Sequence, residues 1–168
     1  MLLRHAKSDW PDHLADHDRP LAKRGQRQAP DMARYMASHG LLPDLVIVST
    51  ARRTQETWQL LKPAFPPATK QLDDGRIYEA PTSSLLQVLR EADDAAHVLL
   101  LIGHNPGFND LANRLIAKEP ASPALARLQR GYPTSGLAVI DFKVDHWADV
   151  ADGGGRLERF ETPASIGD

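Results

Sequence analysis

The chain begins with Met1-Leu2-Leu3-Arg4-His5-Ala6-Lys7-Ser8, in which a short apolar run ends abruptly in an arginine and a histidine. This pattern is typical of a buried strand in an open α/β sheet, where ligands bind at the carboxyl ends of the strands. Arg4 offers a planar fork of donors that suits a phosphate or a carboxylate. His5 can act as a nucleophile or proton carrier near neutral pH. Taken alone, the pair is equally compatible with an ordinary strand end.

Two further apolar runs end in a similar way. Leu45-Val46-Ile47-Val48 leads into Ser49-Thr50-Ala51-Arg52-Arg53-Thr54, and the run from His97 to Ile102 leads into Gly103-His104-Asn105-Pro106-Gly107. Short, continuous apolar runs that are bounded by turn residues are typical of strands buried on both faces. Weaker patterns predict strands near residues 70–72 and 137–142 and an edge strand at 157–161.

Amphipathic helices are expected between these strands. Four apolar residues repeat at helical spacing before a stop at Gly40, namely Ala29, Met32, Ala33 and Met36. Pro30 has to lie in the first turn of this helix or produce a kink. Further helices are predicted up to Pro63, after a cap at Thr82 or Ser83, from Phe108 to Ile116, and in a short segment between Pro120 and Gly131. The alternation of strands and helices predicts one domain, residues 1–168, with a three-layer α/β/α sandwich and a mostly parallel central sheet.

The composition narrows the classes of function. A net charge of -2 gives no reason to expect a nucleic acid or an anionic membrane as partner. The sequence has no cysteine, which excludes disulfides, a thiolate nucleophile and a cysteine-based zinc site. No apolar run approaches the ~18 residues of a membrane span, and we expect a cytoplasmic location. A strand that begins at Met1 would be very short, so a native start upstream of Met1 stays open.

The segment from Asp9 to Asp18 lacks helical or strand periodicity and is interpreted as a surface loop. His13 and His17 are four residues apart and flanked by aspartates, which also suggests a metal site. A helical zinc motif would have a glutamate beside the first histidine, and this segment has none. The solvated loop is therefore the favoured interpretation, and the metal site is the alternative.

The three strong strands would end at one edge of a parallel sheet, which brings Arg4-His5, the segment from Ser49 to Arg53, and His104 together. Cations that lie close to one another raise the energy unless an anion compensates their charge. A phosphoryl group would supply that anion, and its transfer depends mainly on charge stabilisation and in-line alignment. Arg4 and Arg53 would bind oxygens, His5 would attack phosphorus and His104 would donate to another oxygen, without a metal.

Four motifs in this order resemble those of a known family. Leu3-Arg4-His5-Ala6 resembles the Arg-His-Gly signature of the histidine phosphatase superfamily, which has the phosphoglycerate mutase-like fold. The segment from Ser49 to Thr57 looks like its second element, whose spacing selects Arg53 rather than Arg52 as the catalytic arginine. Gly103-His104-Asn105-Pro106-Gly107 looks like the second-histidine element of the SixA-type phosphohistidine phosphatases. Arg19-Pro20-Leu21 followed by Gly25 is similar to the Arg-Pro-Leu element of that subfamily.

The resemblance implies a metal-independent phosphatase, without a cofactor, that works through a phosphohistidine intermediate. Its catalytic residues would be His5, Arg4, Arg53 and His104, and its substrate-binding residues Arg19 and Ser8. The substrate would be a protein that carries phosphohistidine or a small phosphate ester.

Two positions depart from the family pattern. Ala6 replaces the usual glycine, so the turn after His5 has to accept a methyl group. Many members of the superfamily also have a carboxylate that protonates an alkoxide leaving group. Glu79, in Tyr78-Glu79-Ala80, is the candidate for this role, but a plain loop residue is the favoured interpretation. A phosphohistidine substrate needs such an acid less, because protonated imidazole is already a good leaving group.

Two classes of function remain open. The first is the phosphatase, and the second is a phosphate-binding or interaction module that keeps the pocket without turnover. The presence of both histidines and both arginines favours the enzyme, because simple binding needs no nucleophile. A mutase is a weaker third alternative at this chain length.

Overall fold

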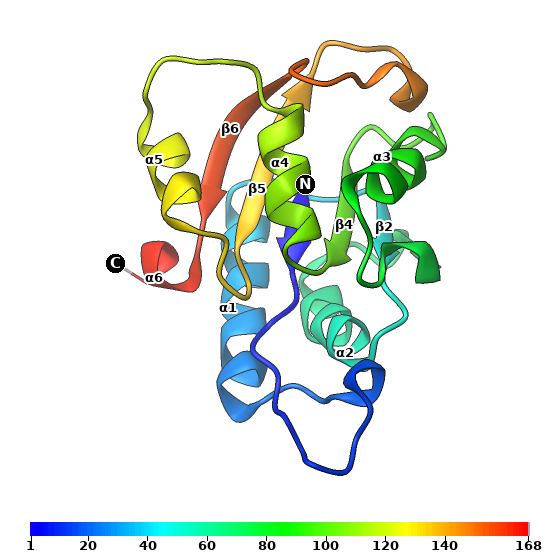
Figure 1. Ribbon diagram of the computed structural model, residues 1–168, viewed down its shortest axis with the longest axis vertical. Coiled ribbons are helices and arrows are strands. Elements are labelled where there is room, and N and C mark those ends of the chain that lie inside the picture. The colour runs from blue at the N-terminus through cyan, green and yellow to red at the C-terminus, as the bar shows by residue number, and fades with distance from the viewer. Residues whose placement is uncertain (168) are drawn as a thin grey trace.

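Six strands form one sheet in the order β3-β2-β4-β1-β5-β6 in the computed structural model of the chain, which describes residues 1–167 (Figure 1). The strands are β1 (Leu2–Arg4), β2 (Leu45–Val48), β3 (Lys70–Asp73), β4 (Leu99–Gly103), β5 (Leu137–Phe142) and β6 (Gly155–Glu161). The first four of that order are mutually parallel, whereas β5 and β6 are antiparallel to their neighbours. The predicted mostly parallel sheet is therefore confirmed.

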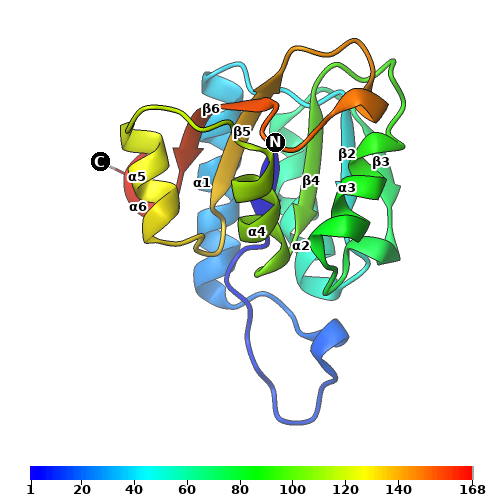
Figure 2. The ribbon, with the colours of Figure 1, turned by 45° about the horizontal axis from the view of Figure 1, so that its top comes forward.

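Helices cover both faces of this sheet, which confirms the predicted three-layer sandwich. They are α1 (Lys23–Ser38), α2 (Arg52–Leu61), α3 (Thr82–Arg90), α4 (Gly107–Leu115), α5 (Pro123–Arg130) and α6 (Pro163–Ile166). Figure 2 shows α3 and α4 in front of the sheet and α1 and α2 behind it. Short 3-10 helices lie at Asp16–Asp18, Lys62–Ala64, Gly75–Ile77 and Trp147–Asp149. None of the helices within residues 1–167 has the length and apolar character needed to cross a membrane.

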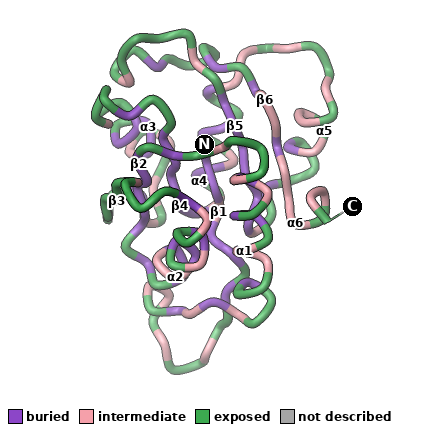
Figure 3. The backbone as a smooth tube through the Cα atoms, turned by 180° about the vertical axis from the view of Figure 1, so that it is seen from behind, coloured by how far each residue is buried: buried purple, intermediate pink, exposed green. Residues whose placement is uncertain are grey.

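Two hydrophobic cores lie on opposite faces of the sheet. In β2, Leu45 and Ile47 pack into the core beneath α3 and α4, whereas Val46 and Val48 pack into the core beneath α1 and α2. Side chains alternate along a strand, so a strand with a core on each face needs an apolar residue at every position. This is the physical reason for the continuous apolar runs in the sequence, and Figure 3 shows these central strands as buried.

Two local predictions differ from the structure, and one of two alternatives for Pro30 is excluded. β4 begins at Leu99 rather than at His97, because the carboxylate of Asp44 accepts the backbone N–H groups of His97 and Val98 in a turn. The predicted cap of α3 at Thr82 or Ser83 is wrong, since Thr82 is the first helical residue and Pro81 precedes it without a side-chain cap. Of the two alternatives for Pro30, the first-turn position is excluded, because α1 already begins at Lys23 and Pro30 lies inside it.

The start of α1 fixes the backbone that follows His5. Gly25 packs so closely on residue 7 that a Cβ at this position would lie 2.2 Å from the carbonyl oxygen of Lys7. The backbone N–H of Ala22 donates to that same oxygen at 2.9 Å. Between these contacts, residues 9–18 form the long loop at the bottom of Figures 1 and 2.

Candidate active site

The carboxyl ends of β1 and β4 place the two predicted histidines next to each other. Arg4 is paired with Gly103 in the parallel ladder, and the backbone N–H of His5 donates to the carbonyl of Gly103 at 3.0 Å. Residues 5 and 104 therefore follow neighbouring strand ends, and the centroids of their rings are 5.3 Å apart. The structure thus brings together the two histidines that the sequence placed at the same sheet edge.

His5 is held as a neutral imidazole with one nitrogen uncommitted. Its Nδ1 lies 2.8 Å from the carbonyl oxygen of Ala6, which can only accept, so Nδ1 carries the proton and Nε2 keeps its lone pair. The side chain is buried, and burial, followed by the charges of Arg53, Arg4 and Arg19, lowers the pKa of His5 to about 3. A neutral, buried imidazole with a free lone pair is suited to nucleophilic attack.

His104 is positioned by Ser49, which follows the end of β2. Its Nε2 lies 2.8 Å from Ser49 Oγ, and its Nδ1 is buried without a protein partner. The hydroxyl of Ser49 accepts the N–H of Ala51 and can donate its own proton to His104 Nε2; in that tautomer Nδ1 carries the imidazole proton. Burial, and then the charges of His5 and Arg53, lower the pKa of His104 to about 3. In that tautomer His104 offers one unpaired N–H donor.

The guanidinium groups of Arg4 and Arg53 are anchored by the protein but keep an unpaired donor each. Arg4 NH1 donates to the carbonyl of Tyr132 at 2.9 Å, and Arg53 donates from NH1 to the carbonyl of Asp16 at 2.7 Å and from NH2 to its carboxylate at 3.1 Å. The Nε atoms of both arginines are buried without a partner. A buried, unpaired donor on a charged group is costly, and an anionic oxygen is its best acceptor.

The structure also separates Arg53 from Arg52. The side chain of Arg53 is 5% exposed and points into the site, whereas that of Arg52 is 52% exposed and pairs with Glu56 on the surface of α2. Adjacent helical residues point about 100° apart, so only one of them can reach the site. The geometry agrees with the register that was read from the spacing to Ser49.

Arg19 and Ser8, the predicted substrate-binding residues, lie together beside this group. Arg19 is buried and donates from NH2 to Ser8 Oγ and from Nε to the carbonyl of Asp9. Its guanidinium stacks on the ring of Trp10, 3.2 Å from the ring centroid. An isolated bridge between Ser8 and Leu21 closes the base of the loop that carries these residues.

Asp16 is a site residue that the sequence analysis missed. Its carboxylate pairs with Arg19 NH1 at 2.8 Å and Arg53 NH2 at 3.1 Å, and it accepts the hydroxyl of Tyr78. Burial alone would raise the pKa of Asp16, but the hydrogen bonds from Tyr78, Arg19 and Arg53 outweigh burial and hold this pKa well below its usual range. From the sequence, residues 9–18 are interpreted as a solvated loop. The only sequence signal for an ion pair with Arg19 is the position of Asp16, three residues before it.

Comparison with known proteins identifies the family. A family model described as "Histidine phosphatase superfamily (branch 1)" matches residues 1–76. The crystal structure of a candidate phosphohistidine phosphatase SixA from Agrobacterium tumefaciens is 32% identical, with 96% of each chain covered and a TM-score of 0.79. The chain belongs to the histidine phosphatase superfamily.

Two more relatives can be aligned over nearly the whole chain of this superfamily member. A candidate SixA structure from Nakamurella multipartitia is 26% identical, with a TM-score of 0.84 and coverage of 96% of this chain and 95% of that chain. An uncharacterized protein of Mycobacterium tuberculosis is 35% identical over 162 residues, which is 96% of this chain and 99% of that protein. The resemblance that was stated from four motifs is confirmed.

The position of Glu79 bears on the question of a general acid in this superfamily member. Glu79 follows Tyr78 with a φ of +47°, and its side chain is exposed. Within residues 1–167 it makes no side-chain hydrogen bond or ion pair of the kind that holds Asp16. This environment agrees with the favoured interpretation of Glu79 as a loop residue.

Ser135 is a second residue that the sequence analysis missed. It is buried, has a φ of +58°, and its backbone N–H donates to the carbonyls of Arg4 and His5. Its Oγ is buried without a partner. No periodicity marks this position, so no sequence signal was available for it.

No group of three or more metal-ligating side chains occurs in the part of the chain that the structure describes. His13 is exposed, and His17 contacts Thr50 Oγ1 through Nε2 at 3.0 Å. His17 also packs edge-on against Tyr78. Residues 9–18 thus form a loop that ends in the 3-10 helix Asp16–Asp18, and His17 in this helix packs against Thr50 and Tyr78.

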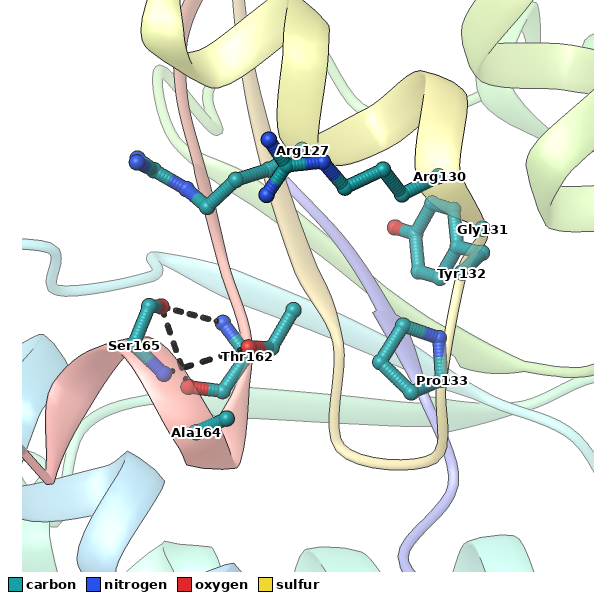
Figure 4. A pocket seen from close by; sticks show the side chains of 8 residues that line it. All are labelled: Arg127, Arg130, Gly131, Tyr132, Pro133, Thr162, Ala164 and Ser165. Carbon is teal, nitrogen blue, oxygen red and sulfur yellow. Dashed lines mark hydrogen bonds between the residues drawn. The ribbon is translucent and has the colours of Figure 1, made fainter.

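A separate cavity of about 540 Å³ lies between α5 and α6 (Figure 4). Its Arg127 already donates to the carbonyl of Phe160 and to Glu161. Thr162 and Ser165 in its wall cap α6 through reciprocal hydrogen bonds. The cavity contains none of the predicted site residues, and we do not assign the active site to it.

Proposed function

We propose that this protein is a metal-independent phosphatase in which His5 is the nucleophile. The observation that carries the proposal is the set of buried, unpaired donors around His5, namely Arg4 Nε, Arg53 Nε and His104 Nδ1. Donors that are fixed before the substrate arrives stabilise developing charge without reorganisation. They suit the oxygens of a phosphoryl group that is being transferred.

The reaction would have two steps. His5 Nε2 forms a bond to phosphorus with its lone pair, and the bond from phosphorus to the leaving group breaks, so that the leaving group departs with the electron pair. A water molecule then attacks the phosphorus of phosphohistidine, the N–P bond breaks, and inorganic phosphate and a proton are released. Arg4, Arg53 and His104 would stabilise the phosphoryl oxygens in both steps, and Arg19 and Ser8 would contribute to binding of the substrate.

We infer that the substrate is phosphohistidine on a protein or a small phosphate ester. An imidazole leaving group needs little help from an acid, and the exposure of Glu79 is consistent with a site that lacks a strong general acid. The relative from Agrobacterium tumefaciens, described as a candidate phosphohistidine phosphatase, gives further support.

A substrate panel tests this proposal directly. Purified protein is assayed in EDTA with a phosphohistidine protein, an aryl phosphate and a phosphosugar, beside a His5→Ala variant. We expect release of phosphate from at least one of the first two substrates, no effect of EDTA, and loss of turnover in the variant. Binding of phosphate without turnover of any substrate would favour the non-catalytic module instead. Activity that depends on added magnesium or zinc would contradict the metal-independent mechanism.

A further inference from the structure

Asp16 occupies a central place among the cations of the site. Its two carboxylate oxygens contact two arginines that come from different elements, Arg19 and Arg53, and its backbone carbonyl accepts a third hydrogen bond, from Arg53 NH1. One residue therefore links both guanidinium groups, and it is the only residue that contacts Arg53 and Arg19 together through its carboxylate within residues 1–167. No other carboxylate in residues 1–167 forms an ion pair with either arginine.

Besides the two arginines, two further contacts hold Asp16 in place. The hydroxyl of Tyr78 donates to its Oδ2, and Tyr78 packs edge-on against His104. The next residue, His17, contacts Thr50 at the end of β2. Asp16 is thus tied to the segment after β2 and, through Tyr78, to the ring of His104, which argues that it keeps its place when an anion enters.

The charges of the site also give Asp16 a role. Arg4, Arg19 and Arg53 are positive, Asp16 is negative, and both histidines are neutral near pH 7 because burial lowers the pKa of each. The net charge of +2 matches a phosphoryl dianion. Without Asp16 the site would carry an excess positive charge, and it would bind free phosphate more tightly.

We propose that Asp16 is a positioning residue that aligns Arg19 and Arg53 for phosphoryl transfer and, as their counter-ion, limits the affinity of the site for inorganic phosphate. This role rests on the proposed phosphatase function and deepens it. A residue of this kind favours turnover, because a product that binds weakly leaves quickly. Loss of the carboxylate should therefore raise the affinity for inorganic phosphate and lower kcat.

The test compares Asp16→Asn with the wild type. Calorimetry measures the Kd for inorganic phosphate, and an aryl phosphate assay measures kcat and KM. We expect phosphate binding to tighten about threefold or more, because a nearby negative charge is removed, and kcat to fall about tenfold or more, because the arginines lose their alignment. Asp18→Asn is the matched control, since Asp18 lies in the same 3-10 helix but is exposed and contacts only His17; both constants should stay within about twofold.

Tyr78→Phe gives an independent measurement if Asp16→Asn does not fold. It removes the hydroxyl that fixes Asp16 and keeps the carboxylate, so kcat should fall with little change in phosphate affinity. A parallel loss of affinity and kcat in Asp16→Asn would show a merely structural role and overturn the proposal. So would a change in only one of the two quantities, or in neither. If the wild type binds phosphate and hydrolyses no substrate, the proposed function fails, and the phosphate affinity of Asp16→Asn alone decides the counter-ion role.

Discussion

The imidazole rings of His5 and His104 lie side by side, with centroids 5.3 Å apart and planes inclined at 52°. Neighbouring strands of a sheet are about 4.8 Å apart, and the two residues directly follow the paired positions Arg4 and Gly103. The backbone ladder between β1 and β4 therefore sets the spacing of the rings. Four predictions follow from this arrangement and from the residues around it.

Arg53 and Arg52 should differ sharply in their effect on activity. Arg53→Ala should lose ~10²-fold or more in kcat/KM, which corresponds to about 3 kcal/mol of transition-state stabilisation. Arg53→Lys should recover little, because a point charge does not reproduce a planar fork of donors. The measurement is kcat/KM on one aryl phosphate.

Arg52→Ala is the control for this prediction. Arg52 pairs with Glu56 on the surface of α2, and its removal should cost less than ~10-fold in kcat/KM. Equal losses at the two positions, or the reverse order, would show that the assignment of Arg53 to the site is wrong.

The buried histidines should make the fold sensitive to acid. The pKa of His5 and that of His104 are each lowered to about 3 in the folded state, whereas an imidazole in an unfolded chain titrates near ~6.5. Between these values the unfolded state binds more protons, so stability is complete above pH 6.5 and falls as the pH falls through this window. Each histidine should account for up to about 2 kcal/mol of lost unfolding free energy between pH 7 and pH 5.

Urea denaturation at both pH values checks this prediction. His104→Gln should lose less stability between pH 7 and pH 5 than the wild type does. His13→Gln replaces an exposed histidine and should behave as the wild type. If His104→Gln and the wild type lose the same free energy, His104 is not buried as a neutral imidazole.

Glu79 should contribute little to turnover of phosphohistidine. Its side chain is exposed, and imidazole leaves without a carboxylic acid, so Glu79→Gln should keep kcat within about threefold. The same variant is assayed with an alkyl phosphate, whose leaving group does need a proton. A loss of ~100-fold on that ester would instead assign Glu79 as the general acid.

Gly25→Ala should destabilise the fold and disturb the site. The added Cβ would lie 2.2 Å from the carbonyl oxygen of Lys7, so α1 or the segment after His5 has to move, at a cost of about 2 kcal/mol or more. Thermal unfolding and kcat are the measurements. Gly75→Ala is the control, because its Cβ would make only ordinary contacts at 3.7 Å with Thr50; equal effects at both positions would contradict the close packing at Gly25.

The sheet was predictable because its pattern is local. Burial on both faces makes β2 and β4 continuous apolar runs, and the polar residues of the candidate site directly follow each run. The parallel arrangement then brings residues 5 and 104 together without further information. The ends of elements were less predictable, since the turn at His97 depends on Asp44, a residue more than 50 positions away.

The contacts of Asp16 could not be read from the sequence. Asp16 and Arg53 are separated by 37 positions, and Asp16 and Tyr78 by 62. A loop without periodicity gives no sign of which side chain turns inward. The contact of Ser135 could not be read from the sequence either, because it is made by its backbone N–H, which donates to the carbonyls of Arg4 and His5.

Because β4 lies between β1 and β2, the contacts of the site cannot all form in the order in which the chain is synthesised. When the first 76 residues have left the ribosome, His5 and Arg53 are both present, but β1 and β2, the strands that precede them, have no ladder in common. β4 joins the two ladders, and Arg4 gains its acceptor later still, at Tyr132. The first 76 residues therefore contain His5 and Arg53 without β4, which links their two ladders, and without Tyr132, which accepts from Arg4.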